Sequence, residues 1–296
     1  MESILYDYGE DSGVTSHLIR QYMYGVKVNV WGLGLALLAQ KAAMIGGHVN
    51  CNRYVSMTGV MRTLTFLREP LQRMISEYEH FRRNYGYKDS FKQFYSRPVM
   101  HNRQSKILHG VDVEALGFVG ITERYESSLQ ILNAKFGIDI PRRMDNQGKA
   151  TLDSVHEIEA DDEAALKEMN KLDIALYKNA VDLFDLRHRF FLGSKRWAHA
   201  RLVEASTQRI SGWAWWADGG NDPVVVEVWV NDVLAGTTIA VDLRPGLAHL
   251  RIPRGAYVGF HFAHKLAVGD CVKCRVAETG QWFPSSPRVV PEAAAK

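Results

Sequence analysis

The chain has 296 residues, of which 46% are hydrophobic and 23% charged, and its formal net charge is +3. This length allows two domains with cores of their own, and the composition is that of an ordinary globular protein. The charge is too small for nucleic-acid binding by bulk electrostatics, so any anion site must be local. The apolar stretch from Val28 to Ala39 is too short to cross a bilayer of roughly 30 Å, and the first residues lack a signal pattern. We therefore expect a cytoplasmic protein without a transmembrane segment.

After a polar, acidic start, the first 45 residues predict two apolar helices, around Leu18–Tyr24 and Leu33–Ala43. We expect no strand and no phosphate loop here, because Gly32-Leu33-Gly34 lacks the Lys and Ser/Thr that such a loop needs. A short strand from Met44 to Asn50 then enters a turn.

The stretch from Val60 to Arg83 predicts a strand, a turn and a helix. Val60 to Leu67 is apolar or β-branched, which is typical of a buried strand, and Pro70 suits the first turn of a helix. The helix has an apolar stripe at helical spacing, with Arg73 and Ser76 on its other side. Helix N–H groups, a forked cation and a hydroxyl can converge there on one anion, and a surface helix with solvated arginines is the alternative.

Alternating elements continue beyond this stretch. The pattern predicts helices at Ser90–Tyr95 and Gln104–Leu108, a buried strand at Leu116–Ile121, a helix through Leu132, a loop from Ile138 to Asp153, and helices within Asp161–Phe190. Strands that alternate with helices indicate a mainly parallel α/β sheet.

The pattern changes near Phe191–His199, and helical periodicity stops from Leu202 onward. Short strands are predicted at Ile210–Trp216, Val224–Val230, Gly236–Val241, Tyr257–Phe262 and Val272–Ala277, with a hairpin turn at Asn231-Asp232. We predict an α/β domain over residues 1–197 and an all-β sandwich over 198–296. Four tryptophans of the second part are candidates for stacking on sugars, although core packing is the stronger interpretation: Trp213, Trp215, Trp216 and Trp229.

The cysteines do not indicate a metal site. Cys271 and Cys274 form a lone C-x-x-C, with no second pair and no histidine at ligand spacing, and Cys51 lies far away in the sequence. We expect no metal and reduced thiols.

Five segments, in order, resemble the sulfotransferase family that includes the heparan-sulfate 2-O- and 6-O-sulfotransferases and bacterial relatives. They are Gly46–Val49, Leu67–Tyr78, Asn102–Leu108, Gly120–Leu129 and Leu172–Tyr177. The resemblance covers about residues 1–190 and implies a P-loop-like, mainly parallel sheet.

The resemblance also implies an activity and a site. The family transfers a sulfuryl group from 3′-phosphoadenosine 5′-phosphosulfate (PAPS) to a hydroxyl, usually on a carbohydrate, without a metal. It implies that Arg68 and Ser76, with Arg73 beside them, hold the nucleotide 3′-phosphate. His48 is then the general base, because an imidazole near its ordinary pKa can take a hydroxyl proton at neutral pH. The alternative for His48 is a turn histidine whose ring bonds the backbone.

One departure from the family pattern bears on activity. Family members open with a strand and a Pro-Lys-x-Gly-x-Thr/Ser loop that holds the 5′-phosphosulfate, and nothing before Gly46 carries this loop. We therefore expect the first strand–helix unit to be missing, the sheet to be truncated at its N-terminal side, and sulfation to be impaired or lost. The alternative function is a non-catalytic remnant that binds a nucleotide, a carbohydrate or a protein. A P-loop kinase is disfavoured because no Gly-Lys-Ser/Thr loop exists.

The C-terminal part more loosely resembles a β-sandwich module found beside bacterial glycosyltransferases. The resemblance rests on Ile210–Ala214, Val224–Val230, Asp242–Pro245 and Gly259-Phe260.

Overall fold

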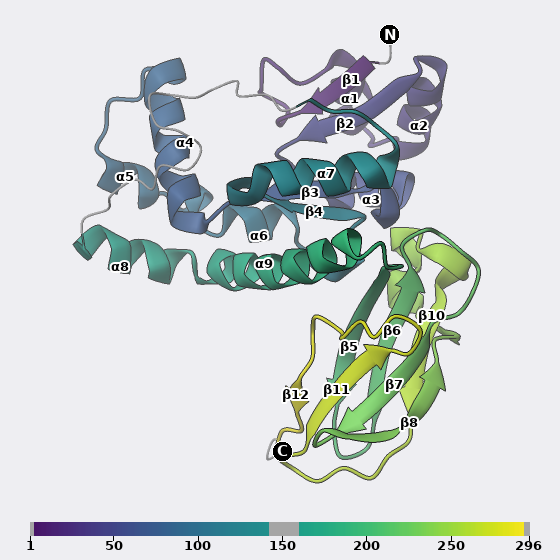
Figure 1. Cartoon of the computed structure of the whole chain (residues 1–296). Helices are drawn as coiled ribbons and strands as arrows, with labels where there is room; N and C mark the ends of the chain where they lie inside the picture. The colour runs from purple at the N-terminus through teal and green to yellow at the C-terminus, as the bar shows by residue number, and fades with distance from the viewer. Residues whose placement is uncertain (1–2, 142–159, 293–296) are drawn as a thin grey trace.

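The computed structural model describes residues 3–141 and 160–292, and it is a mixed α/β structure (Figure 1). The helices are α1 (His17–Met23), α2 (Val30–Ala39), α3 (Asn52–Thr58), α4 (Pro70–Tyr85), α5 (Phe91–Tyr95), α6 (Arg103–Ile107), α7 (Tyr125–Phe136), α8 (Ala160–Met169) and α9 (Lys171–Leu192). The strands are β1 (Ser3–Asp7), β2 (Ala42–Gly47), β3 (Leu64–Leu67), β4 (Phe118–Ile121), β5 (Ala198–Ala205), β6 (Ile210–Trp216), β7 (Val225–Val230), β8 (Val233–Ile239), β9 (Asp242–Leu243), β10 (Tyr257–Phe262), β11 (Cys271–Val276) and β12 (Arg288–Val289). Most of the loop predicted over 138–153 lies outside the described residues.

The first half contains parallel strands, as predicted. Within the described residues they form two separate pairs, β1 with β2 and β3 with β4. The second pair runs in continuous register from Leu64 opposite Phe118 to Leu67 opposite Ile121. Helices α7 and α9 both contact β4, and β4 is buried along its whole length. The carboxyl ends of β3 and β4 therefore lie together at one edge, which is where parallel sheets position ligand sites.

Strand β1 corrects one of our predictions. Residues Ser3–Asp7 form a strand parallel to β2, and the chain then passes through a turn over residues 8–16 into α1. The segment alternates as a half-buried strand does, with Leu5 and Asp7 buried and Ile4 and Tyr6 exposed. A first strand–helix unit is thus present, and the expectation that it is missing was wrong.

The second strand–turn–helix unit forms where it was predicted, but its strand starts later. Gly59 has a φ of 82° and a short 3-10 turn covers Val60–Arg62, so that extended pairing begins only at Leu64. Helix α4 begins at Pro70 and ends at Tyr85, and the next residue, Gly86, has a φ of 64°, the left-handed conformation that suits a helix C-terminus. Leu71, Met74 and Ile75 are buried, which confirms the start of the predicted apolar stripe.

The second half consists of two antiparallel sheets, ordered β5-β6-β10-β9 and β12-β11-β7-β8. One buried cluster draws side chains from both sheets, among them Leu202 and Phe260 from the first and Val228 and Cys274 from the second. The predicted hairpin turn is confirmed: Asn231 and Asp232 have φ of 49° and 64°, as a two-residue turn between β7 and β8 requires. Strand β5 was not predicted.

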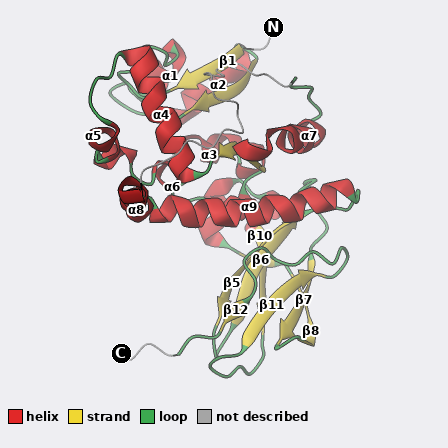
Figure 2. Ribbon diagram, turned by 60° about the vertical axis from the view of Figure 1, so that its left-hand side comes forward, coloured by secondary structure: helices red, strands yellow, loops and turns green. Residues whose placement is uncertain are grey.

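The two halves share a continuous core. Trp213, Trp215 and Ile252 of the second half pack in one buried cluster with Leu116 and Phe184 of the first. Helix α9 lies between the remaining helices and the antiparallel strands (Figure 2). The indoles of Trp213, Trp215 and Trp216 are almost fully buried, so these tryptophans pack in the core rather than stack on a ligand.

Candidate anion-binding site

The turn between β3 and α4 carries the predicted arginine, and other elements hold its backbone. The Gln104 side chain accepts a hydrogen bond from the Arg68 N–H at 2.9 Å and donates one to the Arg68 carbonyl at 2.9 Å. Glu69 caps α4 by accepting from the Gln72 N–H at 2.7 Å. The Arg68 backbone therefore makes both of its hydrogen bonds to α6, and its side chain takes no part in fixing the turn.

A second support comes from the turn that follows β4. One oxygen of the Glu123 carboxylate accepts from the Glu69 N–H at 2.8 Å, and the other accepts from the Tyr177 hydroxyl of α9 at 2.9 Å. Burial, followed by the Glu123 charge, raises the pKa of Tyr177, which keeps its hydroxyl protonated as the donor. Glu123 thereby connects the ends of both parallel strands to α9.

Helices α6 and α9 cap each other at their N-termini. The buried Asp173 of α9 accepts from the N–H groups of Gln104 and Ser105, at 3.1 and 2.7 Å, and from the Ser105 hydroxyl at 2.7 Å. In return, the Asn102 side chain accepts from the N–H groups of Leu172 and Asp173 at 2.9 and 3.2 Å. This exchange satisfies orphan helix donors on both sides and fixes α6, which in turn holds Arg68.

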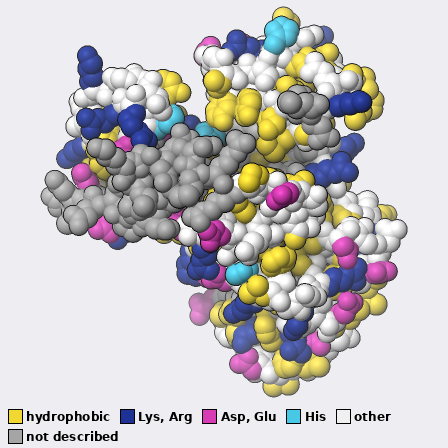
Figure 3. Space-filling model, turned by 45° about the horizontal axis from the view of Figure 1, so that its top comes forward, with side chains coloured by type: hydrophobic (Ala, Val, Ile, Leu, Met, Phe, Trp, Pro, Cys, Tyr) yellow, Lys and Arg dark blue, Asp and Glu magenta, His cyan; other side chains and the backbone are white. Residues whose placement is uncertain are grey.

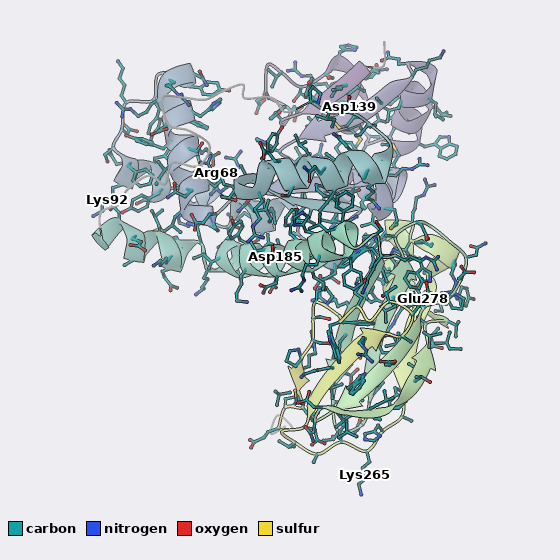
Figure 4. The ribbon with its side chains drawn as sticks, viewed as in Figure 1. Arg68, Lys92, Asp139, Asp185, Lys265 and Glu278 are labelled. Atoms are coloured by element: carbon teal, nitrogen blue, oxygen red, sulfur yellow. The ribbon has the colours of Figure 1, made fainter. Side chains whose placement is uncertain are left out.

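The Arg68 guanidinium has no hydrogen-bond or ion-pair partner among residues 3–141 and 160–292. It is half-buried and lies between α4 and the start of α7 (Figure 4). The Ser76 hydroxyl, in the second turn of α4, likewise has no partner within the described residues. Both side chains are therefore free of partners among the described residues, Arg68 on the turn after β3 and Ser76 on α4.

Arg73 lies in a different situation. Its guanidinium pairs with Glu77 and donates to the Met100 carbonyl at 3.2 Å, and Glu77 also pairs with Arg103. Only its Nε atom is buried without a partner among the described residues. Burial lowers the pKa of Arg73 despite the carboxylate beside it. Most N–H donors of Arg73 are therefore already used within the protein. Arg73 can offer an anion its positive charge, but few free hydrogen-bond donors.

His48 follows β2 and approaches the same network. Its backbone N–H donates to the Asp7 carbonyl at 3.1 Å, and its ring lies edge-on to Tyr8 at 5.0 Å between centroids. Gly47 is required just before it, because a Cβ atom there would lie 1.9 Å from the Asp7 carbonyl oxygen. Desolvation, and then the charge of Arg103, lower the pKa of His48 below 6.5. The ring is therefore neutral at neutral pH and can accept a proton.

The turn between β1 and α1 is closed on itself. The Thr15 hydroxyl accepts from the Tyr8 N–H at 3.0 Å and donates to the Gly9 carbonyl at 2.7 Å, and the Ser16 hydroxyl accepts from the Tyr6 N–H at 2.9 Å. The turn contains no lysine and carries the carboxylates of Glu10 and Asp11. The hydroxyls of this turn already bond backbone groups of β1 and of the turn itself, and its two carboxylates repel anions.

Asp7, at the end of β1, is a buried charge that sequence reasoning missed. It is fully buried, accepts from the Gly9 N–H at 3.1 Å and the Tyr24 hydroxyl at 2.8 Å, and also bonds the Tyr54 hydroxyl. Burial and the Asp7 hydrogen bond raise the pKa of Tyr24 to about 12. The only available signal was a carboxylate that ends an alternating strand. The Asp7 carboxylate holds the turn at residues 8–16 through Gly9, and the Asp7 backbone carbonyl accepts the hydrogen bond from the His48 N–H.

Among residues 3–141 and 160–292, no group of three or more His, Cys, Asp or Glu side chains is arranged to hold a metal ion.

Comparison with protein-family models, curated proteins and solved structures found no match to this chain.

Proposed function

We propose that this chain is a sulfotransferase-like protein that binds PAPS, or the corresponding 3′,5′-bisphosphate (PAP), at the carboxyl ends of β3 and β4. The observation that carries the proposal is Arg68, a half-buried guanidinium without a partner among the described residues, on a turn fixed by Gln104. A forked cation held in this way suits a phosphate, and Ser76 adds a hydroxyl from α4. Arg73 adds positive charge from within its salt-bridge network.

In the proposed reaction His48 is the general base. Its neutral ring takes the proton from an acceptor hydroxyl, such as that of a glycan, while the hydroxyl oxygen bonds to sulfur and the nucleotide bisphosphate leaves. The lowered pKa of His48 supports this role because the free base is the dominant form at neutral pH. The chemistry and a P-loop-like core are proposed from the resemblance to the sulfotransferase family. The β-sandwich accessory module is proposed from the separate resemblance of the C-terminal part to modules found beside bacterial glycosyltransferases.

A second candidate, nucleotide binding without catalysis, is favoured by one observation. The turn between β1 and α1 has no lysine, carries Glu10 and Asp11, and bonds its own hydroxyls of Thr15 and Ser16. The leaving phosphate oxygens would then have no cation from this turn, and charge stabilisation on the leaving group is a large part of such catalysis. We therefore propose that binding is retained and that transfer is impaired.

Calorimetric titration of the full chain with PAP tests the proposal. We expect Arg68→Ala to weaken PAP binding by roughly 10- to 100-fold, the loss of one or two charge-assisted hydrogen bonds. Arg62→Ala, an exposed arginine at the other end of β3, is the matched control and should bind as the wild type does.

Adenosine 5′-monophosphate, which lacks the 3′-phosphate, should bind both Arg68 forms equally. Equal PAP affinities of the wild type and Arg68→Ala would refute the site. Transfer of radiolabelled sulfate from PAPS to a glycan mixture separates the two candidates: binding with transfer favours the enzyme, and binding without it favours the non-catalytic protein.

A further inference from the structure

Helix α2 is apolar on two sides, and only one of them is covered. Leu33 is fully buried and packs with Leu5 and Ile19, with Val30 and Leu37 beside it. On the other side, Trp31, Leu35 and Leu38 are 76%, 54% and 78% exposed. Their spacing of four and three residues places them on a single stripe of the helix.

The exposed stripe continues into the segment before the helix. Val26 and Val28 are 104% and 62% exposed and directly precede α2. We call Val26, Val28, Trp31, Leu35 and Leu38 the α2 patch. Figure 3 shows apolar side chains exposed at the right-hand edge of the upper part of the molecule, the side on which α2 lies in Figure 1. Scattered exposed apolar residues are normal, whereas a contiguous stripe of this kind marks an interaction surface.

The charged residues of the sequence segment that carries the patch are all cationic. From Ser12 to Arg68 there is no Asp or Glu, and the charged residues are Arg20, Lys27, Lys41, Arg53, Arg62 and Arg68. Lys27 and Lys41 are exposed and flank α2 on either end. The apolar stripe is therefore bordered by positive charge and by no negative charge of its own segment.

This charge pattern distinguishes between occupants. A second copy of the chain on a two-fold axis through α2 would bring Lys27 and Lys41 of both copies together, which is unfavourable. A surface of anionic phosphates would instead pair with these lysines while the apolar side chains leave water. The 10 residues of α2 span only about 15 Å, so the helix can lie on a bilayer but not cross it. Within residues 3–141 and 160–292, no helix is long and apolar enough to cross a membrane.

We infer that the α2 patch is a docking surface for an anionic lipid membrane. Trp31, Leu35 and Leu38 enter the boundary between headgroups and acyl chains, and Lys27 and Lys41 contact the lipid phosphates. Two lysines and one apolar stripe form a weak, reversible and salt-sensitive attachment. The inference does not depend on the proposed nucleotide site.

Flotation of the full chain with lipid vesicles tests the inference. Vesicles of equal parts phosphatidylcholine and phosphatidylserine should carry the protein upward at low salt, and phosphatidylcholine alone should carry much less. The triple variant Trp31→Ala, Leu35→Ala, Leu38→Ala should partition at least about tenfold less, because it removes most of the buried apolar area. Lys27→Gln and Lys41→Gln should each lower binding to the anionic vesicles roughly fivefold.

Leu192→Ala with Val233→Ala is the matched control, since these residues are 67% and 69% exposed but lie outside the patch. This variant should float as the wild type does. If the triple variant fails to fold, as judged by circular dichroism, the two lysine variants decide the question.

Two results would overturn the inference. One is that the wild type, the triple variant and the lysine variants all float to the same extent, which includes the case that none of them floats. The other is a wild type that is dimeric by light scattering and does not float, with a triple variant that is monomeric, which would make the patch a self-association surface.

Discussion

The first half contains two strand–turn–helix units, β1 to α1 and β3 to α4. They have the same order of elements, but the backbone groups of their turns are hydrogen-bonded in opposite ways. In the first unit, the turn over residues 8–16 bonds its own groups: Thr15 and Ser16 accept from backbone N–H groups of β1 and of the turn. In the second unit, Gln104 and Glu123 reach in from other elements and hold the turn from outside.

The difference teaches what makes such a turn available to a ligand. Buried backbone N–H and C=O groups are nearly always hydrogen-bonded in the folded state, so a turn whose backbone has no support from other elements uses its own side chains for this purpose. In the second turn, Gln104 holds the backbone of Arg68 from outside, so the Arg68 side chain is not needed there, although Glu69 still caps α4. Arg68 is free for this reason, whereas Thr15 is not.

Removing the external support should have the largest effect. Gln104→Leu leaves the N–H and carbonyl of Arg68 without partners, and we expect the free energy of unfolding to fall by about 2–3 kcal/mol. PAP affinity should also fall about tenfold, because the turn that carries the Arg68 guanidinium is no longer fixed. Urea denaturation and calorimetry measure the two effects.

Gln21→Leu, at an exposed position of α1, is the matched control and should change neither quantity. A Gln104→Leu protein of wild-type PAP affinity would show that external support of the turn does not matter for binding.

Removing the hydrogen bonds within the first turn should lower the stability of the protein less and should leave PAP binding unchanged. Thr15→Val keeps the shape of the side chain but removes its hydrogen bonds with Tyr8 and Gly9, so we expect a loss of about 1–2 kcal/mol in urea denaturation. PAP affinity should stay within about twofold of the wild type, because this turn does not take part in the proposed binding. Thr237→Val, the same change at an exposed position of β8, serves as control. A tenfold drop in PAP affinity in Thr15→Val would place the first turn in the site.

The smallest effect concerns His48, which contacts the first unit and faces the charges of the second. Its folded pKa is lowered, so the unfolded chain binds the proton more readily and protonation opposes folding. The contribution of His48 is fully present above pH 6.5 and is lost as the pH falls through the folded pKa. Since the ring is exposed, we expect less than about 1 kcal/mol, measured as the difference between wild type and His48→Gln in unfolding at pH 7.5 and 5.

Buried His199, whose pKa burial lowers well below 6.5, responds in the same direction in both proteins and cancels in that difference. His249→Gln, at an exposed position of the second half, is the control. A His48→Gln protein with the same pH dependence as the wild type would contradict the shift.

Local patterns were enough to predict most elements. Helix α4 was found from the spacing of Leu71, Met74 and Ile75, and the β7–β8 turn from Asn231-Asp232. Strand β1 was missed because a five-residue strand with polar neighbours is weak evidence by itself, and its pairing partner β2 starts at Ala42, 35 residues after β1 ends at Asp7. The role of Asp173 was also not predictable, since its three hydrogen bonds go to residues about 70 positions away.

The amino-acid sequence alone determined the helix and strand periodicities, the change to short strands near Leu202, and the candidates Arg68, Ser76, Arg73 and His48, because these depend on neighbours in the chain. Tertiary structure decided which candidates are free: Arg68 and Ser76 have no partner among the described residues, while Arg73 is held by Glu77. It also showed that a first strand–helix unit exists, with a closed and acidic turn. Hydrogen-bond satisfaction is settled only by the elements that come together in space, and a linear pattern does not contain that information.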